Sequence, residues 1–224
     1  NNKLILLFLF EQKIITADES ILQFIQEKSD TKNPERGIKE IINGRFNYNI
    51  YFYPEIKSLL SEEESKKIEE ELKDYTKSDK EIFYKNRRLG ENDSRLCELI
   101  RQDSIEEFIS YINHENISLE SKINLSIFET NPFLIENEPT LIEYSAFYGS
   151  VRVIQYLTKN EIELSPSLWL YSIHSNNPEM IQIIADEKID PPGNNYQQCL
   201  KESIKCHNRN VTEYIINNFI DENE

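Results

Sequence analysis

Apolar residues recur every three or four positions along most of the chain, which is the spacing of one face of an α-helix. Ile68, Leu72 and Tyr75 are an example. The exception lies between Phe46 and Tyr53, where aromatic and polar residues alternate. That alternation predicts one short strand or an extended packing segment. The rest of the pattern predicts an all-α protein.

Four short turns interrupt the helical pattern in the second half of the chain. At each turn, a residue type that tolerates positive φ is followed by a good helix N-cap residue. The pairs are Asp103-Ser104, Gly149-Ser150, Asn176-Asn177 and His207-Asn208. We expect the first residue of each pair to close one helix in the left-handed conformation and the second to begin the next helix. A recurring helix-turn-helix unit is the signature of a solenoid.

The distances between the turns give the size of the unit. The last two intervals are 27 residues (149 to 176) and 31 residues (176 to 207). Each interval holds two helices of about 10 residues plus their loops. The first interval, 46 residues from 103 to 149, is longer by most of one unit. Residues 113–138 within it are predicted to form either a degenerate repeat or an ordered excursion.

Residues around the second turn resemble the ankyrin repeat. Its Thr, Leu, Ala-Ala, Gly, paired aliphatic residues and Leu correspond here to Thr140, Ile142, Ser145-Ala146, Gly149, Val153-Ile154 and Leu157. The match is partial, because Leu141 and Glu143 stand where the repeat usually has Pro and His. The later units replace the Gly with Asn176 and His207.

Longer segments resemble one family more specifically. They are SIFETNPFLIENEPTLIEYSAFYGS, ELSPSLWLYSIHSNNPEMIQ and CLKESIKCHNRNVTEYI. They are similar to a divergent, expanded family of ankyrin-repeat proteins from parasitic protists, whose shared region is catalogued as a domain of unknown function. The resemblance covers roughly residues 50 to 220. It implies an ankyrin-like fold and intracellular protein binding, and it brings no catalytic residues.

The first 92 residues predict an irregular helical region that precedes the solenoid. Ser61 and Glu64 have the spacing of a capping box, and Asn33-Pro34 places an N-cap before a Pro at the first helical position. Residues 61–81 are rich in Glu and Lys and carry a narrow apolar stripe. Because the stripe is shorter than three heptads, we expect a solvated helix lying on the solenoid rather than a dimerising coiled coil. The chain is therefore expected to be monomeric.

The apolar run from Leu4 to Phe10 has two interpretations. Its seven residues are far fewer than the roughly 20 that span a bilayer, so we expect no membrane segment. It has the length of a signal-peptide core, but no small-x-small cleavage site follows. We therefore expect a buried helix. Met180 is the only Met, so the chain as given lacks an initiator, and we expect a fragment or a processed product.

Charge separates the two predicted regions, residues 1–92 and 93–224. The first has 16 basic and 18 acidic residues (net −2), and the second has 9 basic and 22 acidic residues (net −13), which sum to the total of −15. An array this acidic repels phosphate backbones, so we expect no nucleic-acid partner. A protein partner with a basic surface is accommodated more easily.

Candidate chemistry is sparse. Cys199 and Cys206 lie seven residues apart on one helical face beside His207, but no nearby Cys or His completes a tetrahedral metal set. We expect two buried thiols, no metal and no cofactor. His114 and His174 lack a Ser or Cys in a nucleophile motif, so we expect no catalytic residues and no enzyme. Three Cys without a secretory signal favour a reducing compartment, and hence a soluble cytoplasmic protein.

In ankyrin-like arrays, the first helix of each pair and the connecting loops line the concave face. The candidate partner-binding residues on first helices are Tyr144, Tyr148, Tyr171 and His174. The alternative for the tyrosines is that they fill space between neighbouring repeats, which is also the expectation for Trp169. The predicted function is an intracellular protein-interaction scaffold. A dimerising assembly element and the regulatory arm of a larger enzyme remain as alternatives.

Overall fold

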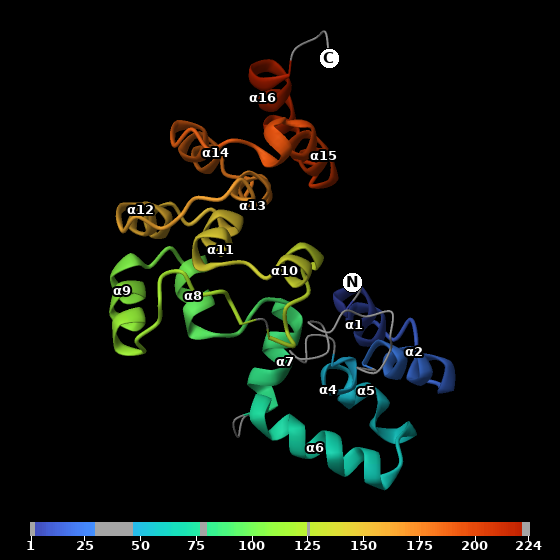
Figure 1. Ribbon diagram of the computed structural model, residues 1–224. Helices are drawn as coiled ribbons and strands as arrows, with labels where there is room; N and C mark the ends of the chain where they lie inside the picture. The colour runs from blue at the N-terminus through green and yellow to red at the C-terminus, as the bar shows by residue number, and fades with distance from the viewer. Residues whose placement is uncertain (1–2, 30–46, 77–79, 125, 221–224) are drawn as a thin grey trace. The chain divides into compact units, whose positions relative to one another are not determined.

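The computed structural model in Figure 1 describes residues 3–29, 47–76, 80–124 and 126–220. Within these ranges the chain is all-helical. It contains one isolated antiparallel bridge, between Lys122 and Thr140, and no strand. The expected all-α class is confirmed for this part of the chain.

The chain divides into two compact units. The first unit comprises residues 1–93 together with 124–137, and the second comprises residues 94–123 together with 138–224. The helices of the first unit are α1 (Lys3–Glu11), α2 (Glu19–Ser29), α4 (Tyr48–Tyr51), α5 (Tyr53–Ile56), the 3-10 helix η1 (Lys57–Leu59), α6 (Glu62–Thr76), α7 (Lys80–Leu89) and α10 (Pro132–Asn137).

The predicted strand between Phe46 and Tyr53 is wrong for its described part. Residues 48–51 and 53–56 form the short helices α4 and α5. The aromatic residues of this segment are all buried: Tyr48, Tyr51, Phe52 and Tyr53. Alternation of apolar and polar residues indicates a strand when one side of the strand faces solvent. This segment is buried on all sides, so its alternation did not indicate a strand. Phe46 and the predicted N-cap at Asn33-Pro34 lie outside the described residues.

Helix α6 begins at the predicted capping box. Ser61 Oγ accepts from the Glu64 backbone N–H (3.3 Å), and Glu64 Oε2 accepts from the Ser61 backbone N–H (3.0 Å). Its apolar stripe packs against the core of the first unit, with Ile68 buried and Leu72 and Tyr75 partly buried. The stripe is therefore not open to a second copy of the chain.

Helix α1 is buried along one face only. Leu7 is in the core, whereas Ile5 and Phe8 are 59% and 55% exposed. Lys3 is also buried, and its Nζ donates to the backbone carbonyl of Ile127 (2.7 Å). The expectation of a buried helix in the run from Leu4 to Phe10 therefore holds for one of its faces.

The segment 124–137 packs with the first unit, although it lies inside the predicted region 93–224. Phe128 is fully buried, and its ring centroid lies 5.6 Å from that of Phe83. Thr130 donates its hydroxyl to the Gly90 carbonyl (2.8 Å). Of the two alternatives for residues 113–138, the ordered excursion describes this segment, because its apolar side chains complete the core of the first unit.

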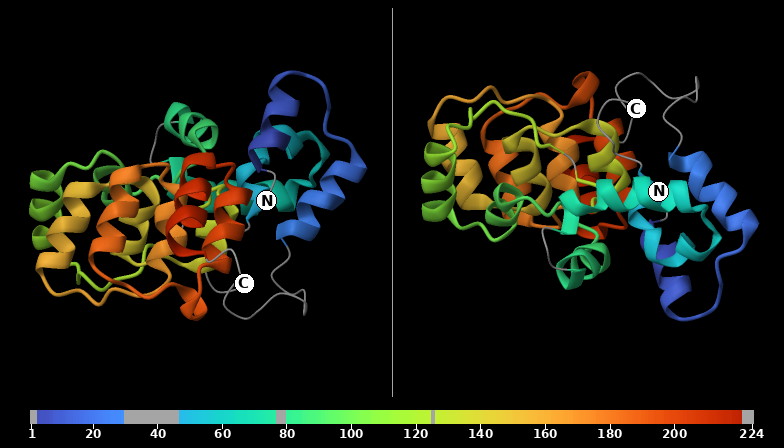
Figure 2. Two further views of the ribbon diagram at one scale, coloured as in Figure 1. Left: turned by 90° about the horizontal axis from the view of Figure 1, so that it is seen from above. Right: turned by 90° about the horizontal axis from the view of Figure 1, so that it is seen from below.

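The second unit consists of successive helix pairs. They are α8 (Arg95–Arg101) with α9 (Ile105–His114), α11 (Leu141–Tyr148) with α12 (Val151–Lys159), α13 (Leu168–His174) with α14 (Pro178–Asp186), and α15 (Gln197–Lys205) with α16 (Arg209–Phe219). The 3-10 helix η2 (Pro192–Asn194) precedes the last pair. Contacts join α8 to α11, α11 to α13 and α13 to α15, so the first helices form one layer (Figures 1 and 2).

The turn between the helices of each pair has the predicted backbone. Its left-handed residues are Asp103 (φ 49°), Gly149 (φ 71°), Asn176 (φ 51°) and His207 (φ 53°). The next residue is the N-cap of the second helix in all four pairs. Two of these caps make equivalent bonds to the preceding pair. Ser150 Oγ donates to the Ile100 carbonyl (2.6 Å), and Asn208 Nδ2 donates to the Ile173 carbonyl (3.3 Å).

Small residues allow the helices to approach each other. Ala146 is fully buried, as are Ser145, Ser172 and Ser203, which stand four residues before successive turns. Each of these hydroxyls donates to a backbone carbonyl of its own helix. The hydroxyls of these three serines are thus paired where the helices pack.

Candidate functional site

The C-terminal ends of the first helices carry a repeated constellation of side chains. One position of the constellation stands two residues before the left-handed residue of each turn. In the first three pairs it is occupied by Arg101, Phe147 and His174. In the first and third of these pairs, this position lies beside two positions of the following pair. Those positions stand five and one before the next turn.

Arg101 shows the relation at the first interface between pairs. Its Nη1 donates to the hydroxyl of Tyr144 (2.8 Å), which stands five before the next turn. Its guanidinium lies 5.7 Å from the ring centroid of Tyr148, which stands one before that turn. The two tyrosine rings lie 4.8 Å apart. The guanidinium therefore joins α8 to α11 through a hydrogen bond and a cation–π contact.

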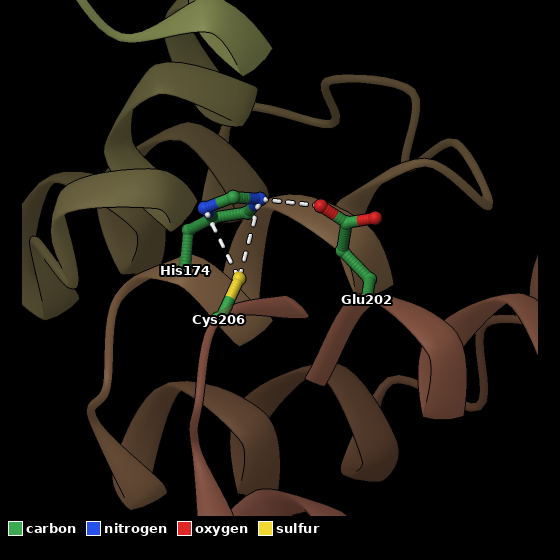
Figure 3. Close-up of side chains that lie close together, drawn as sticks. All are labelled: His174, Glu202 and Cys206. Atoms are coloured by element: carbon green, nitrogen blue, oxygen red, sulfur yellow. Dashed lines mark hydrogen bonds and ion pairs between the residues drawn. The ribbon is translucent and has the colours of Figure 1, made fainter. Parts of the chain in front are cut away.

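His174 repeats the relation at the last interface. Its Nε2 lies 3.1 Å from Glu202 Oε1, five before the turn at His207. The Cys206 sulfur, one before that turn, lies 3.4 Å from His174 Nδ1 and 3.7 Å from Nε2. Figure 3 shows the three side chains meeting between α13 and α15. The residues of the His174–Glu202–Cys206 cluster thus stand at the same positions relative to their turns as Arg101, Tyr144 and Tyr148.

Phe147 connects the two constellations. Its ring stacks on the His174 imidazole, with centroids 4.9 Å apart and planes 22° apart, and its centroid lies 5.0 Å from that of Tyr148. A continuous line of contacts therefore crosses the four first helices. We call it the first-helix row, and its residues are Arg101, Tyr144, Tyr148, Phe147, His174, Glu202 and Cys206.

Burial sets the protonation of the cluster. It lowers the pKa of His174, although the Glu202 carboxylate partly opposes this effect. Burial, reinforced by Glu202, raises the pKa of the Cys206 thiol to about 11. At neutral pH the pair is therefore imidazole and thiol, not imidazolium and thiolate.

The cluster also contains three potential metal-ligand atoms within 4.8 Å of one another, one each from His174, Glu202 and Cys206. This set differs from the group considered in the sequence. Cys199 is fully buried, and burial raises the pKa of its thiol to about 12. His207 is exposed in the turn. The expectation of two buried thiols holds for Cys199, whereas Cys206 is half-buried against the imidazole.

The predicted partner-binding residues fall into two groups. Tyr144 and Tyr171 are buried, so they do not offer exposed anchors, and Tyr144 contacts Arg101 of the neighbouring helix pair. Tyr148 and His174 are partly exposed. Trp169 is buried as expected, and its indole Nε1 donates to the Ile189 carbonyl (2.8 Å).

Arg101, Phe147, Glu202 and Cys206 complete the row and were not among the predicted binding residues. The signal that finds them is the register itself. Each lies one, two or five residues before a left-handed turn residue, and these positions meet wherever first helices stack. Hydrophobicity gave no such signal, since the four residues differ in chemical class.

Comparison with protein-family models, with curated proteins and with solved structures yields no match for this chain. The resemblance to divergent ankyrin-repeat proteins therefore stays a prediction that the residues alone support. Among the described residues, every helix is too short or too polar to cross a bilayer.

Proposed function

We propose that the second unit is an ankyrin-like solenoid and that the protein is an intracellular protein-interaction scaffold without catalysis. The observation that carries the proposal is the first-helix row. Arg101, Tyr148 and His174 are partly exposed, and each is held by a neighbour from the adjacent pair. Side chains held in place lose little conformational entropy when a partner binds, which favours affinity.

The buried tyrosines support this surface from behind. Tyr144 fixes the guanidinium of Arg101, and its own ring stands in contact with that of Tyr148. Arg and Tyr are enriched among the residues that dominate binding energy at protein interfaces. The row thus combines a rigid base with residue types suited to protein recognition.

Charge favours one kind of partner. Residues 93–224 carry a net charge of −13, from 9 basic and 22 acidic residues. Opposite charge on a partner accelerates encounter and suppresses like-charged competitors. We therefore propose a protein partner with a basic surface and no nucleic-acid partner.

The dimerising alternative rested on the apolar stripe of α6, which packs against the core of the first unit. Under the proposal, the mass in solution stays that of one chain across a wide concentration range. A mass that rises with concentration would restore the assembly function as the better proposal. The regulatory-arm alternative concerns a larger protein and keeps the same binding surface.

The proposal is tested with two variants of the whole chain that change charge equally. Arg101→Glu places a carboxylate beside Tyr148 in the row, whereas Arg209→Glu makes the same charge change on α16, where the Arg209 side chain is 87% exposed. Partners are captured from the source cell extract with the wild-type chain, and the recovered protein is then titrated in purified form against all three chains.

We expect Arg101→Glu to weaken the affinity by at least about tenfold, which is the size of an interface anchor effect. Arg209→Glu should leave the affinity within about twofold. Thermal melting of each chain confirms that the variants fold. Equal affinity of the two variants for every captured protein would refute a binding role for the row.

A further inference from the structure

The His174–Glu202–Cys206 cluster combines three different ligand types in one place. Zn²⁺ is bound in proteins by thiolate sulfur, imidazole nitrogen and carboxylate oxygen, and a site with three protein ligands leaves a fourth position for water. The side chains of His174 and Glu202 are 14% and 13% exposed, and Cys206 is half-buried. A small ion can therefore reach the cluster from one side.

The distances from His174 Nε2 to the other two ligand atoms are close to those that one ion requires. Zinc–ligand distances of about 2.0 to 2.3 Å at the tetrahedral angle place two ligand atoms of the same ion about 3.4 to 3.6 Å apart. Here Nε2 of His174 lies 3.1 Å from Glu202 Oε1 and 3.7 Å from the Cys206 sulfur. The sulfur is nearly equidistant from both ring nitrogens and so faces the ring. Binding therefore requires the Cys206 side chain to turn toward Nε2.

One carboxylate oxygen of Glu202 is directed toward the imidazole. Lys205 Nζ lies 2.8 Å from Glu202 Oε2, so the ammonium group of Lys205 contacts one carboxylate oxygen. The other oxygen, Oε1, faces the imidazole. A neutral imidazole is the form that binds metal. The thiol has to release its proton, and a bound divalent ion supplies the positive charge that stabilises the thiolate.

We propose that His174, Glu202 and Cys206 form a three-ligand Zn²⁺ site that joins α13 to α15. The ion takes the place of the hydrogen bond between Nε2 and Oε1, the ring proton of His174 moves to Nδ1, and the Cys206 proton is released to solvent. The site lies at the end of the first-helix row and links the last two helix pairs. Zinc therefore stabilises the folded second unit, because it binds the folded form and not the separated helices.

The test uses the whole chain, purified under reducing conditions and freed of metal. Co²⁺ is the probe, because a cobalt–thiolate bond gives a charge-transfer absorption that carboxylates and imidazoles alone do not give. The variants are Cys206→Ser, which retains buried Cys97 and Cys199, and Glu202→Gln, which retains the thiol. The control is His207→Gln, which removes an exposed imidazole next to the cluster in sequence.

We expect the wild-type chain and His207→Gln to bind one Co²⁺ with thiolate absorption, which Zn²⁺ abolishes by displacement. Cys206→Ser should lose the absorption completely. Glu202→Gln should bind at least about tenfold more weakly, since even residues behind the ligands change metal affinity by that factor. Zn²⁺ should raise the melting temperature of the wild-type and control chains but not that of Cys206→Ser.

Three results would overturn the proposal. The wild-type chain shows no thiolate absorption with Co²⁺, the absorption persists in Cys206→Ser, or Glu202→Gln binds as tightly as the wild type. Circular dichroism of each variant without metal shows whether it folds. If Cys206→Ser fails to fold, Glu202→Gln decides between the outcomes.

Discussion

Among the described residues of the first unit two cations are buried, and their partners differ. Arg87 Nη2 lies 2.7 Å from Glu55 Oε2, which gives its guanidinium a carboxylate in direct contact. Lys3 Nζ instead contacts the backbone carbonyl of Ile127, which carries no full charge. Burial therefore lowers the pKa of Lys3 to about 7, and the more distant Glu129 opposes this only in part.

The Lys3 ammonium makes stability depend on pH. In the unfolded chain Lys3 keeps its proton up to a pKa of about 10.4, so above pH 7 the unfolded state binds more protons than the folded state. Folding free energy then becomes more favourable as pH rises, by at most about 1.4 kcal/mol per pH unit. The window ends near pH 8.5, where the cysteines begin to ionise in the unfolded chain.

We expect Lys3→Met to be more stable than the wild type at pH 7 and to lack the rise between pH 7 and 8.5. Urea unfolding at several pH values measures this. Lys66→Met, on an exposed position of α6, should keep the rise. A rise that survives in Lys3→Met would assign it to another group.

His174 gives a second pH prediction, at the candidate site. Burial lowers its pKa below the ordinary value of about 6.5, and the Glu202 carboxylate works against that shift. Stability from this group is present above pH 6.5 and is lost as pH falls below it, because protonation then favours the unfolded chain. Glu202→Gln should move the His174 midpoint further down, as followed by NMR of the ring protons. Glu179→Gln should leave it in place, and an upward shift in Glu202→Gln would contradict the assignment.

At the scale of elements, the sequence predicted the turns that depend on a residue's own side chain. It did not predict the features that depend on residues distant in the chain. Asp103, Asn176 and His207 adopt positive φ because their own side chains tolerate it, which a sequence reveals directly. The helices near Tyr48 and the meeting of His174 with Cys206 depend on neighbours that are distant in the chain. The contact between His174 and Cys206 can be predicted from the turn register, but only once it is known that the first helices stack.

Close packing of the first helices leads to the next prediction. Ala146 on α11 is fully buried, and contacts join α11 to both α8 and α13. Ala146→Glu places an unpaired carboxylate there, which should destabilise the second unit by more than about 3 kcal/mol. Gln155→Glu adds the same charge at an exposed position of α12 and should change the stability by less than about 0.5 kcal/mol. Thermal melting compares the two, and equal melting temperatures would exclude the packing around Ala146.

At the scale of the whole molecule, the chain enters the second unit at Ser94, leaves it after Ile123 and returns at Glu138. The sequence pattern placed a boundary near residue 92 but gave no reason to separate residues 124–137 from their neighbours. The apolar residues of this segment are compatible with the core of either unit. Which core they complete depends on aromatic partners such as Phe83 and Tyr75, which precede them by about 45 residues or more in the chain.

Phe128→Ala tests this division. Phe→Ala in a core costs about 3–5 kcal/mol, and the partners of Phe128 all belong to the first unit. Hydrogen exchange should therefore accelerate at the amides of residues 48–56 and 80–89, while the amides of α11 to α14 keep their rates. Phe133→Ala, in the same segment but partly exposed, should have a smaller effect. Equal acceleration of exchange in both units would show that Phe128 stabilises both of them. The assignment of Phe128 to the core of the first unit alone would then be wrong.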